Sequence, residues 1–220
     1  MCGRYTLAVS PARLAARFGV APLDVQPRYN IAPTQLAPVV RVNAGTREAA
    51  MLRWGLIPSW ADDANIGARM INARSETVLE KPAFRTAFRR RRCLIPASGF
   101  YEWQTTSAGK QPFYFTPVEG DLMAFAGLWE QWHAPDGAVI ESYAILTTAA
   151  NEMVAPIHDR MPVILPPDID ALWLDPTADA ARLHELCLTP PPVKLRAYPV
   201  SKAVNQVRND GEALIRPLSG

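Results

Sequence analysis

Residues 93–104, CLIPASGFYEWQ, decide the fold class of this chain. The stretch is short, apolar and aromatic, which predicts a strand. Further strands are expected at 113–116, 122–131 and 138–148, with turn signals at Ala108-Gly109 and at Pro135-Asp136-Gly137 between them. Successive strands joined by short turns predict a β-meander at the centre of the fold.

Shorter elements are expected on both sides of these strands. Ser10 followed by Pro11 is typical of a helix start and Gly19 of a helix end, so we expect a helix at 12–18. The remaining expected elements are strands at 3–9, 35–42, 48–54 and 193–200, and helices at 81–92, 151–156, 168–174 and 178–187. Residues 55–72 lack periodicity and predict a long structured loop, a type of segment that is often functional.

The composition is that of a globular protein. The 220 residues are 49% hydrophobic and 20% charged, which argues against disordered and fibrous classes. Three cysteines without a C-x-x-C pair favour neither a disulfide framework nor a zinc site, and fit a reducing cytoplasm. No apolar run reaches about 18 residues, so we expect neither a signal peptide nor a membrane span.

Charge is unevenly distributed along the chain. The formal net charge is only +2, but residues 1–110 carry 16 basic and 7 acidic side chains, and residues 111–220 carry 7 basic and 14 acidic ones. This asymmetry is a weak indication of an anionic partner, because folding can interleave the two halves.

Cys2 has chemistry that depends on its position. Removal of Met1 would place a free α-amine and a thiol on adjacent carbons. The α-amine has a reference pKa near 7.8 against about 10.4 for lysine, so its free-base fraction at pH 7 is about 400-fold larger. Such an amine forms an imine with an aldehyde, and the neighbouring thiolate can then close a thiazolidine ring. Position alone also fits an ordinary second residue.

Several other polar residues have both a structural and a functional interpretation. Glu102 lies among aromatic residues, either on the solvent face of its strand or desolvated with a raised pKa. His158 is either structural or catalytic. Residues 72–76 could form a helix start capped by Ser75, and the arginines at 89–92 a solvated helix face, a localisation signal or a phosphate contact.

Three tryptophans also have two interpretations, and several common functional motifs are absent. Trp54, Trp60 and Trp103 are either core residues or platforms for unpaired bases. No glycine-rich phosphate loop, nucleophile elbow or metal-ligand spacing is present, so we expect no nucleotide cofactor, no other cofactor and no metal.

Six short motifs follow one another along the chain. They are Cys2-Gly3-Arg4-Tyr5-Thr6, Asn30-Ile31-Ala32-Pro33-Thr34, Arg53-Trp54-Gly55-Leu56-Ile57-Pro58, Asn72-Ala73-Arg74-Ser75-Glu76-Thr77, Gly99-Phe100-Tyr101-Glu102-Trp103 and His158-Asp159-Arg160-Met161-Pro162. Together they resemble the SRAP (SOS-response-associated peptidase) family, whose members cross-link to abasic DNA. The resemblance implies a single α+β domain over residues 1–220, with an antiparallel barrel-like β core and flanking short helices.

The resemblance also implies a site and a substrate. Cys2, exposed by loss of Met1, would be the nucleophile, and Asn72 would position the terminus and sense the abasic sugar. Glu102 would stabilise the sugar and shuttle protons, while His158 would promote opening of the sugar ring to the aldehyde. These four are the expected catalytic residues. The expected DNA-binding residues are Arg4, Arg74 and Arg160 at phosphates and Trp54 packed near the lesion.

The function implied is that of an abasic-site sensor that cross-links to single-stranded DNA and shields the lesion during the DNA damage response. Associated activities would be an AP-lyase-like reaction and self-processing peptidase activity. We expect a cytoplasmic monomer that joins the nucleoid when bound to DNA. Two other hypotheses remain open: an N-terminal-nucleophile cysteine amidohydrolase or peptidase, and a non-catalytic single-strand binding module.

Overall fold

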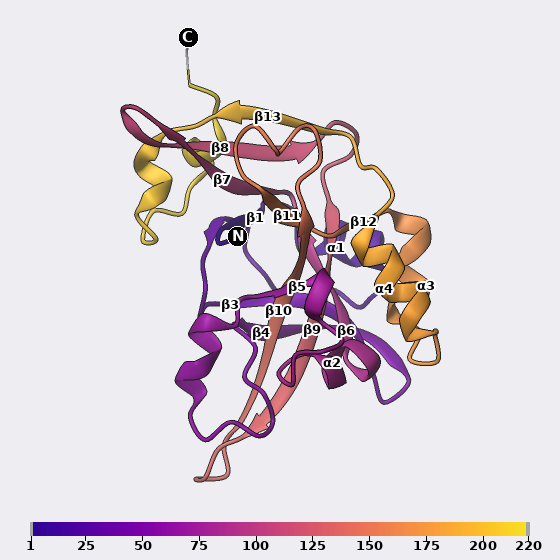
Figure 1. Ribbon diagram of the computed structural model, residues 1–220. Helices are drawn as coiled ribbons and strands as arrows, with labels where there is room; N and C mark the ends of the chain where they lie inside the picture. The colour runs from indigo at the N-terminus through magenta and orange to yellow at the C-terminus, as the bar shows by residue number, and fades with distance from the viewer. Residues whose placement is uncertain (1, 219–220) are drawn as a thin grey trace.

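The computed structural model describes residues 2–218, whose strands form two sheets (Figure 1). One sheet contains a closed five-stranded barrel. Its strands pair in the order β10–β4–β3–β6–β9, and β9 pairs again with β10. Their bounds are Leu36–Asn43 (β3), Thr46–Trp54 (β4), Arg92–Ala97 (β6), Met123–His133 (β9) and Val139–Ala149 (β10). All of these pairs are antiparallel except β4–β10, which is parallel.

The second sheet has five strands in the order β13–β8–β7–β1–β2 and lies across one end of the barrel (Figure 1). Its strands are Tyr5–Leu7 (β1), Arg28–Ile31 (β2), Gly99–Thr106 (β7), Gly109–Pro117 (β8) and Leu195–Pro199 (β13). Aromatic packing joins it to the barrel, because the Tyr5 ring lies 5.2 Å from Trp54 and 6.1 Å from Phe125. The Tyr5 hydroxyl also hydrogen-bonds the Tyr143 hydroxyl at 2.7 Å. The strand that follows Cys2 is thus fixed to the core.

Three short strands extend the barrel sheet. They are Asn72–Arg74 (β5), Arg160–Pro162 (β11) and Ile164–Leu165 (β12). β5 pairs in parallel with β10 at residues 145–147, and β11 pairs antiparallel with β10 at residues 147–149. The C-terminal half of β10 therefore joins segments that lie more than 80 residues apart in the chain.

The helices are short and lie outside the barrel. They are Pro11–Phe18 (α1), Arg85–Arg90 (α2), Asp170–Leu174 (α3) and Ala180–Leu188 (α4), and the 3-10 helices are Ala64–Arg69 (η1), Ser75–Thr77 (η2), Pro167–Ile169 (η3), Lys202–Asn205 (η4) and Glu212–Ile215 (η5). α1 begins and ends as predicted: the Ser10 side chain accepts from the Arg13 backbone N–H, and Gly19 adopts a left-handed φ of 63°.

A C-terminal segment, residues 200–218, lies against the start of the chain. The Asn30 side chain donates to the carbonyl oxygens of Val204, Gln206 and Asn209 at 3.2, 3.1 and 2.8 Å. The Arg4 guanidinium donates to the same Val204 carbonyl at 2.7 Å. The two ends of the described chain are therefore held together by buried polar contacts.

The predicted α+β class with a barrel core is confirmed, and the predicted meander is wrong. The apolar run at 93–104 forms two strands in different sheets, β6 and β7, which meet at Ser98. Gly99 fits this corner because a Cβ there would lie 2.3 Å from the Tyr114 ring. The helix expected at 81–92 is confined to α2, and 151–156 forms turns instead of a helix.

Candidate functional site

Cys2 lies three residues before β1 and is buried, with 0% of its surface exposed. The Asn72 side-chain amide donates to the Cys2 carbonyl oxygen at 3.0 Å. Asn72 is in position to do so because β5 pairs with β10, with Asn72 opposite Ile145. The structure thus brings together the two residues that were expected to act as nucleophile and positioning group.

Glu102 reaches the same place from β7. Tyr5 pairs with Phe100, and the Tyr101 backbone N–H donates to the Arg4 carbonyl at 3.0 Å, so the antiparallel register carries Glu102 alongside the first residues of the chain. Its side chain is desolvated, with 2% of the residue exposed. Burial raises the pKa of Glu102 from 4.5 to about 8, so most of it is protonated at pH 7.

His158 lies in the loop before β11 and faces Glu102. Its Nε2 is 3.8 Å from the Glu102 carboxylate oxygen Oε2. Burial lowers the pKa of His158 below 6.5, so the imidazole is neutral at pH 7. One group whose pKa is raised and one whose pKa is lowered form an acid and a base at neutral pH.

The Cys2 thiol is fully protonated at neutral pH in this arrangement. Burial is the main cause of its raised pKa, and the nearby charge of Glu102 adds to it. A thiolate is the reactive form of cysteine. Addition of this sulfur to a bound substrate therefore needs a group that accepts its proton.

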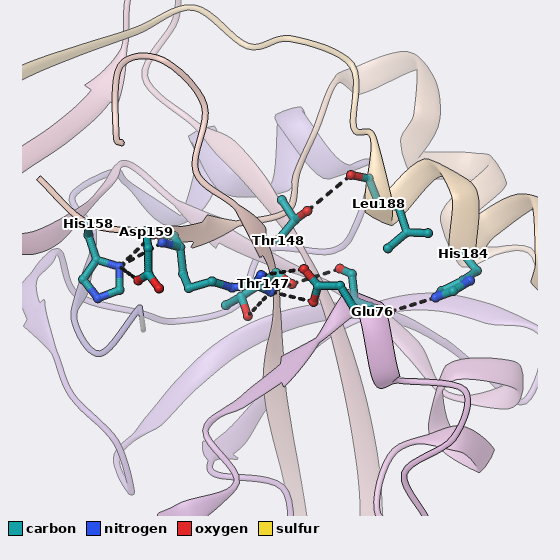
Figure 2. Close-up of polar contacts among 9 residues, drawn as sticks. Glu76, Thr147, Thr148, His158, Asp159, His184 and Leu188 are labelled. Carbon is teal, nitrogen blue, oxygen red and sulfur yellow. Dashed lines mark hydrogen bonds and ion pairs between the residues drawn. The ribbon is translucent and has the colours of Figure 1, made fainter. Parts of the chain in front are cut away.

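The three candidate phosphate-binding arginines differ in exposure. Arg74 is exposed beside Asn72. Arg4 donates inward through Nη1, to Val204 O and to Asn30 Oδ1 at 2.9 Å. The Arg160 side chain is 13% exposed, and it forms a two-pronged ion pair with Glu76 at 2.5 and 2.8 Å (Figure 2).

The structure corrects two expectations about DNA contacts. Trp54 is 0% exposed: its Nε1 donates to the Ile71 carbonyl at 2.9 Å, and its ring stacks on Tyr143, so it is a core residue with no surface for DNA. Arg92, one of the arginines for which a phosphate contact was considered, is 5% exposed and donates to the main-chain oxygens of Phe88, Arg89, Trp173 and Asp175. Its guanidinium therefore hydrogen-bonds inside the protein and does not face a DNA phosphate.

A surface cavity of about 580 Å³ opens beside Asn72. Its lining combines aromatic and cationic side chains, and consists of Trp60, Met70, Asn72, Arg74, Thr77, Lys81, Pro82, Ala83 and Phe84. Trp60 is 58% exposed, which is unusual for so large an apolar ring. Aromatic faces with nearby positive charge are suited to unpaired bases and phosphates.

Comparison with known proteins agrees with these features. Residues 1–207 match the SOS response associated peptidase (SRAP) family. The chain belongs to the SRAP family. Similar members include abasic site processing protein YoqW of Bacillus subtilis (strain 168), 39% identical over 98% of this chain and 99% of its own length. Abasic site processing protein HMCES of Gallus gallus is 33% identical over 99% of this chain and 78% of its own length.

Solved structures resemble this SRAP protein closely. A crystal structure of a protein from Bacteroides thetaiotaomicron has a TM-score of 0.89 at 24% identity, covering 99% of this chain and 100% of that one, and this likeness shows the fold. One from Bordetella bronchiseptica has a TM-score of 0.77 at 29% identity, over 91% and 100%. In residues 2–218 no helix is long and apolar enough to cross a membrane.

Sequence reasoning missed three parts of this SRAP site. Lys81 and Phe84 were assigned to a helix, but both precede α2 and line the cavity, and Phe84 also packs against the core. The third is Glu76, which was considered only as a residue of a first helical turn. The signal for it was the acidic side chain in the Asn72–Thr77 motif, but its partner Arg160 lies 84 residues away.

Proposed function

We propose that this protein recognises abasic sites in single-stranded DNA and joins them covalently through Cys2 after Met1 has been removed. The observation that carries the proposal is the convergence on Cys2 of Asn72 and of Glu102 and His158, whose pKa values are shifted in opposite directions. The names of its relatives, which are abasic site processing proteins, support the same substrate. Shielding of the lesion, in the cytoplasm and at the nucleoid, is part of the proposal.

The reaction begins with the sugar. An abasic deoxyribose is mostly a closed hemiacetal, and opening it to the aldehyde requires a base at the ring hydroxyl and an acid at the ring oxygen. Glu102 can take the proton from the hydroxyl and deliver it to the ring oxygen, because a pKa of about 8 leaves both of its protonation states populated near neutral pH. Neutral His158 can stabilise the developing charge with a hydrogen bond from its ring. Asn72 keeps the Cys2 carbonyl, and with it the α-amine, at a fixed position.

Bond formation then takes place at one carbon. The Cys2 α-amine adds to the aldehyde and water leaves, giving an imine. The Cys2 sulfur adds to the imine carbon, its proton passes to the nitrogen, and a five-membered thiazolidine closes. An imine that is not trapped can instead lose the 3′ phosphate by β-elimination, which would be the lyase reaction. Hydrolysis of the Met1–Cys2 peptide bond must come first, whether at this site or by a separate aminopeptidase.

DNA is held by its backbone in this proposal. A lesion without a base offers sugar and phosphates, so recognition rests on sequence-independent contacts. Arg74 and Arg4 are assigned to phosphates, with Arg160 contributing at its exposed edge beside Glu76. The exposed Trp60 ring, in place of the buried Trp54, is suited to stack on a base next to the lesion.

The test is formation of an adduct that survives denaturation. Single-stranded DNA with one abasic site is incubated with the wild type, with Cys2→Ala and with Cys187→Ala, which removes another buried cysteine. We expect adduct with wild type and Cys187→Ala and none with Cys2→Ala, and intact mass should show loss of one methionine. A full yield from Cys2→Ala would overturn the proposal, and turnover of a peptide without DNA would favour the amidohydrolase.

A further inference from the structure

Glu76 and Arg160 connect the two segments that carry the candidate catalytic residues. Glu76 lies in η2, directly after the strand that holds Asn72, and Arg160 begins β11, two residues after His158. Arg160 Nη1 and Nη2 donate to the two carboxylate oxygens of Glu76 at 2.5 and 2.8 Å, and Nη2 also donates to the Thr147 carbonyl at 2.8 Å (Figure 2). A two-pronged pair fixes direction as well as distance.

The Glu76 side of this contact has a rigid base. The preceding residue, Ser75, donates through its hydroxyl to the Thr147 carbonyl at 3.0 Å. The Ser75 carbonyl lies 2.8 Å from Nε2 of His184 on α4. The backbone next to Glu76 is therefore held from two sides. A Glu76 carboxylate fixed in this way determines where the Arg160 guanidinium lies.

Arg160 makes a second contact through its backbone. Its N–H donates to Nδ1 of His158 at 3.0 Å, and its carbonyl oxygen lies 3.2 Å from the same Nδ1. The hydrogen on a backbone nitrogen is fixed, so Nδ1 offers its lone pair in the shorter of these two contacts, and a neutral ring then carries its proton on Nε2. Asp159 Oδ1 is 3.2 Å from the same Nδ1, but its side chain is 87% exposed, and hydration weakens its pull on a proton there.

We propose that Glu76 is a positioning residue for His158: it holds the Arg160 guanidinium, the Arg160 N–H is thereby held at His158 Nδ1, and Nε2–H faces Glu102. The inference rests on the proposed function for its role in catalysis. It assigns to Glu76 no contact with DNA or with the reacting atoms. Without the Glu76 carboxylate, a largely buried guanidinium loses its counter-charge and turns toward water, and the 158–160 backbone moves with it.

The direct test is the tautomer of His158, read from imidazole nitrogen chemical shifts at pH 7.5. Wild type should show a single Nε2–H tautomer at His158. Glu76→Gln should show a mixture of tautomers, whereas Glu80→Gln, an exposed glutamate four residues along, should match wild type. An Nδ1–H tautomer in wild type, or an unchanged tautomer in Glu76→Gln, overturns the inference. The wild-type measurement remains decisive if the variant fails to fold.

Kinetics provide the second test. At saturating abasic DNA we expect Glu76→Gln to slow adduct formation about tenfold, below the roughly 10²- to 10⁴-fold that general acid–base catalysis contributes. Affinity for the same DNA, measured in a Cys2→Ala background, should not fall, because Glu76 does not touch DNA in this proposal and a released Arg160 keeps its charge for a phosphate. Weaker binding, together with a rate that returns to the wild-type value at saturating DNA, would show a DNA contact instead and overturn the inference.

A double-mutant cycle tests whether Glu76 acts through Arg160. Arg160→Lys keeps the charge and the backbone N–H but removes the two-pronged geometry. If both residues form one unit, Glu76→Gln/Arg160→Lys should react no more slowly than the slower single variant. Multiplied rate losses would overturn the inference. A full adduct yield with Cys2→Ala would refute the proposed function. The His158 chemical shifts test the inference independently, because they are measured on protein that carries no adduct.

Discussion

The buried carboxyl of Glu102 should lower the stability of the protein as pH rises. Below pH 4.5 it is protonated in both the folded and the unfolded state and contributes nothing to pH dependence. Between pH 4.5 and about 8 the unfolded chain loses this proton while the folded protein keeps it, so the free energy of unfolding falls. With about 1.4 kcal/mol for each pKa unit, the loss reaches at most about 5 kcal/mol.

Replacement of this carboxyl removes its pH dependence. Glu102→Gln cannot ionise, so its free energy of unfolding should rise relative to wild type by several kcal/mol, of the order of 5 at most, between pH 4.5 and 8.5. Urea unfolding at four pH values measures this difference. Its pH-independent part depends on how the amide packs, so only the slope tests the reasoning. A variant expected to impair catalysis should thus lose less stability than wild type as the pH rises.

The control is Glu119→Gln, which changes an exposed glutamate. It should follow wild type at every pH. All proteins must carry the same N-terminus, checked by intact mass, because the charge of the amino terminus lowers the pKa of Glu102. Parallel pH profiles for Glu102→Gln and wild type would refute the argument, since they would mean that this carboxyl ionises in the folded protein much as it does in water.

Three further substitutions test other parts of the structure. Arg74→Ala should weaken single-stranded DNA binding and reduce the salt slope by about one, measured by fluorescence anisotropy; an unchanged slope would remove Arg74 from the interface. Gly99→Ala should cost about 1 to 3 kcal/mol in urea unfolding or more, because its Cβ would lie 2.3 Å from the Tyr114 ring, and wild-type stability would contradict that clash. Trp54→Phe removes one of the two donors to the Ile71 carbonyl, which keeps the Ile145 N–H, so it should cost about 0.5 to 1.5 kcal/mol while DNA affinity stays unchanged; weaker DNA binding by a fully folded variant would restore Trp54 as a contact.

Elements that depend on local signals could be predicted from the sequence. The Ser10 cap, Pro11 and Gly19 define α1 without help from the rest of the chain. The turn at 43–45, which joins β3 and β4, is also local. Its chain reversal needs positive φ at Ala44 and Gly45 and no partner elsewhere in the chain. The pattern of such residues is sufficient, since the interactions span only a few positions.

Elements that depend on distant partners could not be predicted. Nothing near Ser98 shows that β6 pairs with β3 and β9 while β7 pairs with β1 and β8. Arg92 continues a basic helical pattern, yet it begins a strand because buried carbonyl groups of Phe88 and Trp173 accept its hydrogen bonds. Exposure, which decides whether a tryptophan stacks on a base or packs in the core, is likewise a property of the whole fold.

The candidate site likewise has a part that could be predicted from the sequence and a part that depends on distant partners. The motifs named Cys2, Asn72, Glu102 and His158, and the structure brings these four residues together. The contact of Glu76 with Arg160 could not be inferred, because it depends on β5 and β11 pairing with the same strand, β10. A motif identifies candidate residues, whereas pairing between distant strands determines which of these residues contact and position one another.

The contact between Arg4 and Val204 also has a consequence for synthesis. It spans 200 residues, so at about 5 to 20 residues per second Val204 is translated about 10 to 40 s after Arg4. During that interval the start of the chain has no partner from residues 204–209. An aminopeptidase at the ribosome would remove Met1 before the candidate site has formed around the start of the chain. Self-removal needs that folded site, so it would have to wait until the chain is finished. The time at which Met1 leaves, measured on stalled nascent chains, therefore separates the two routes.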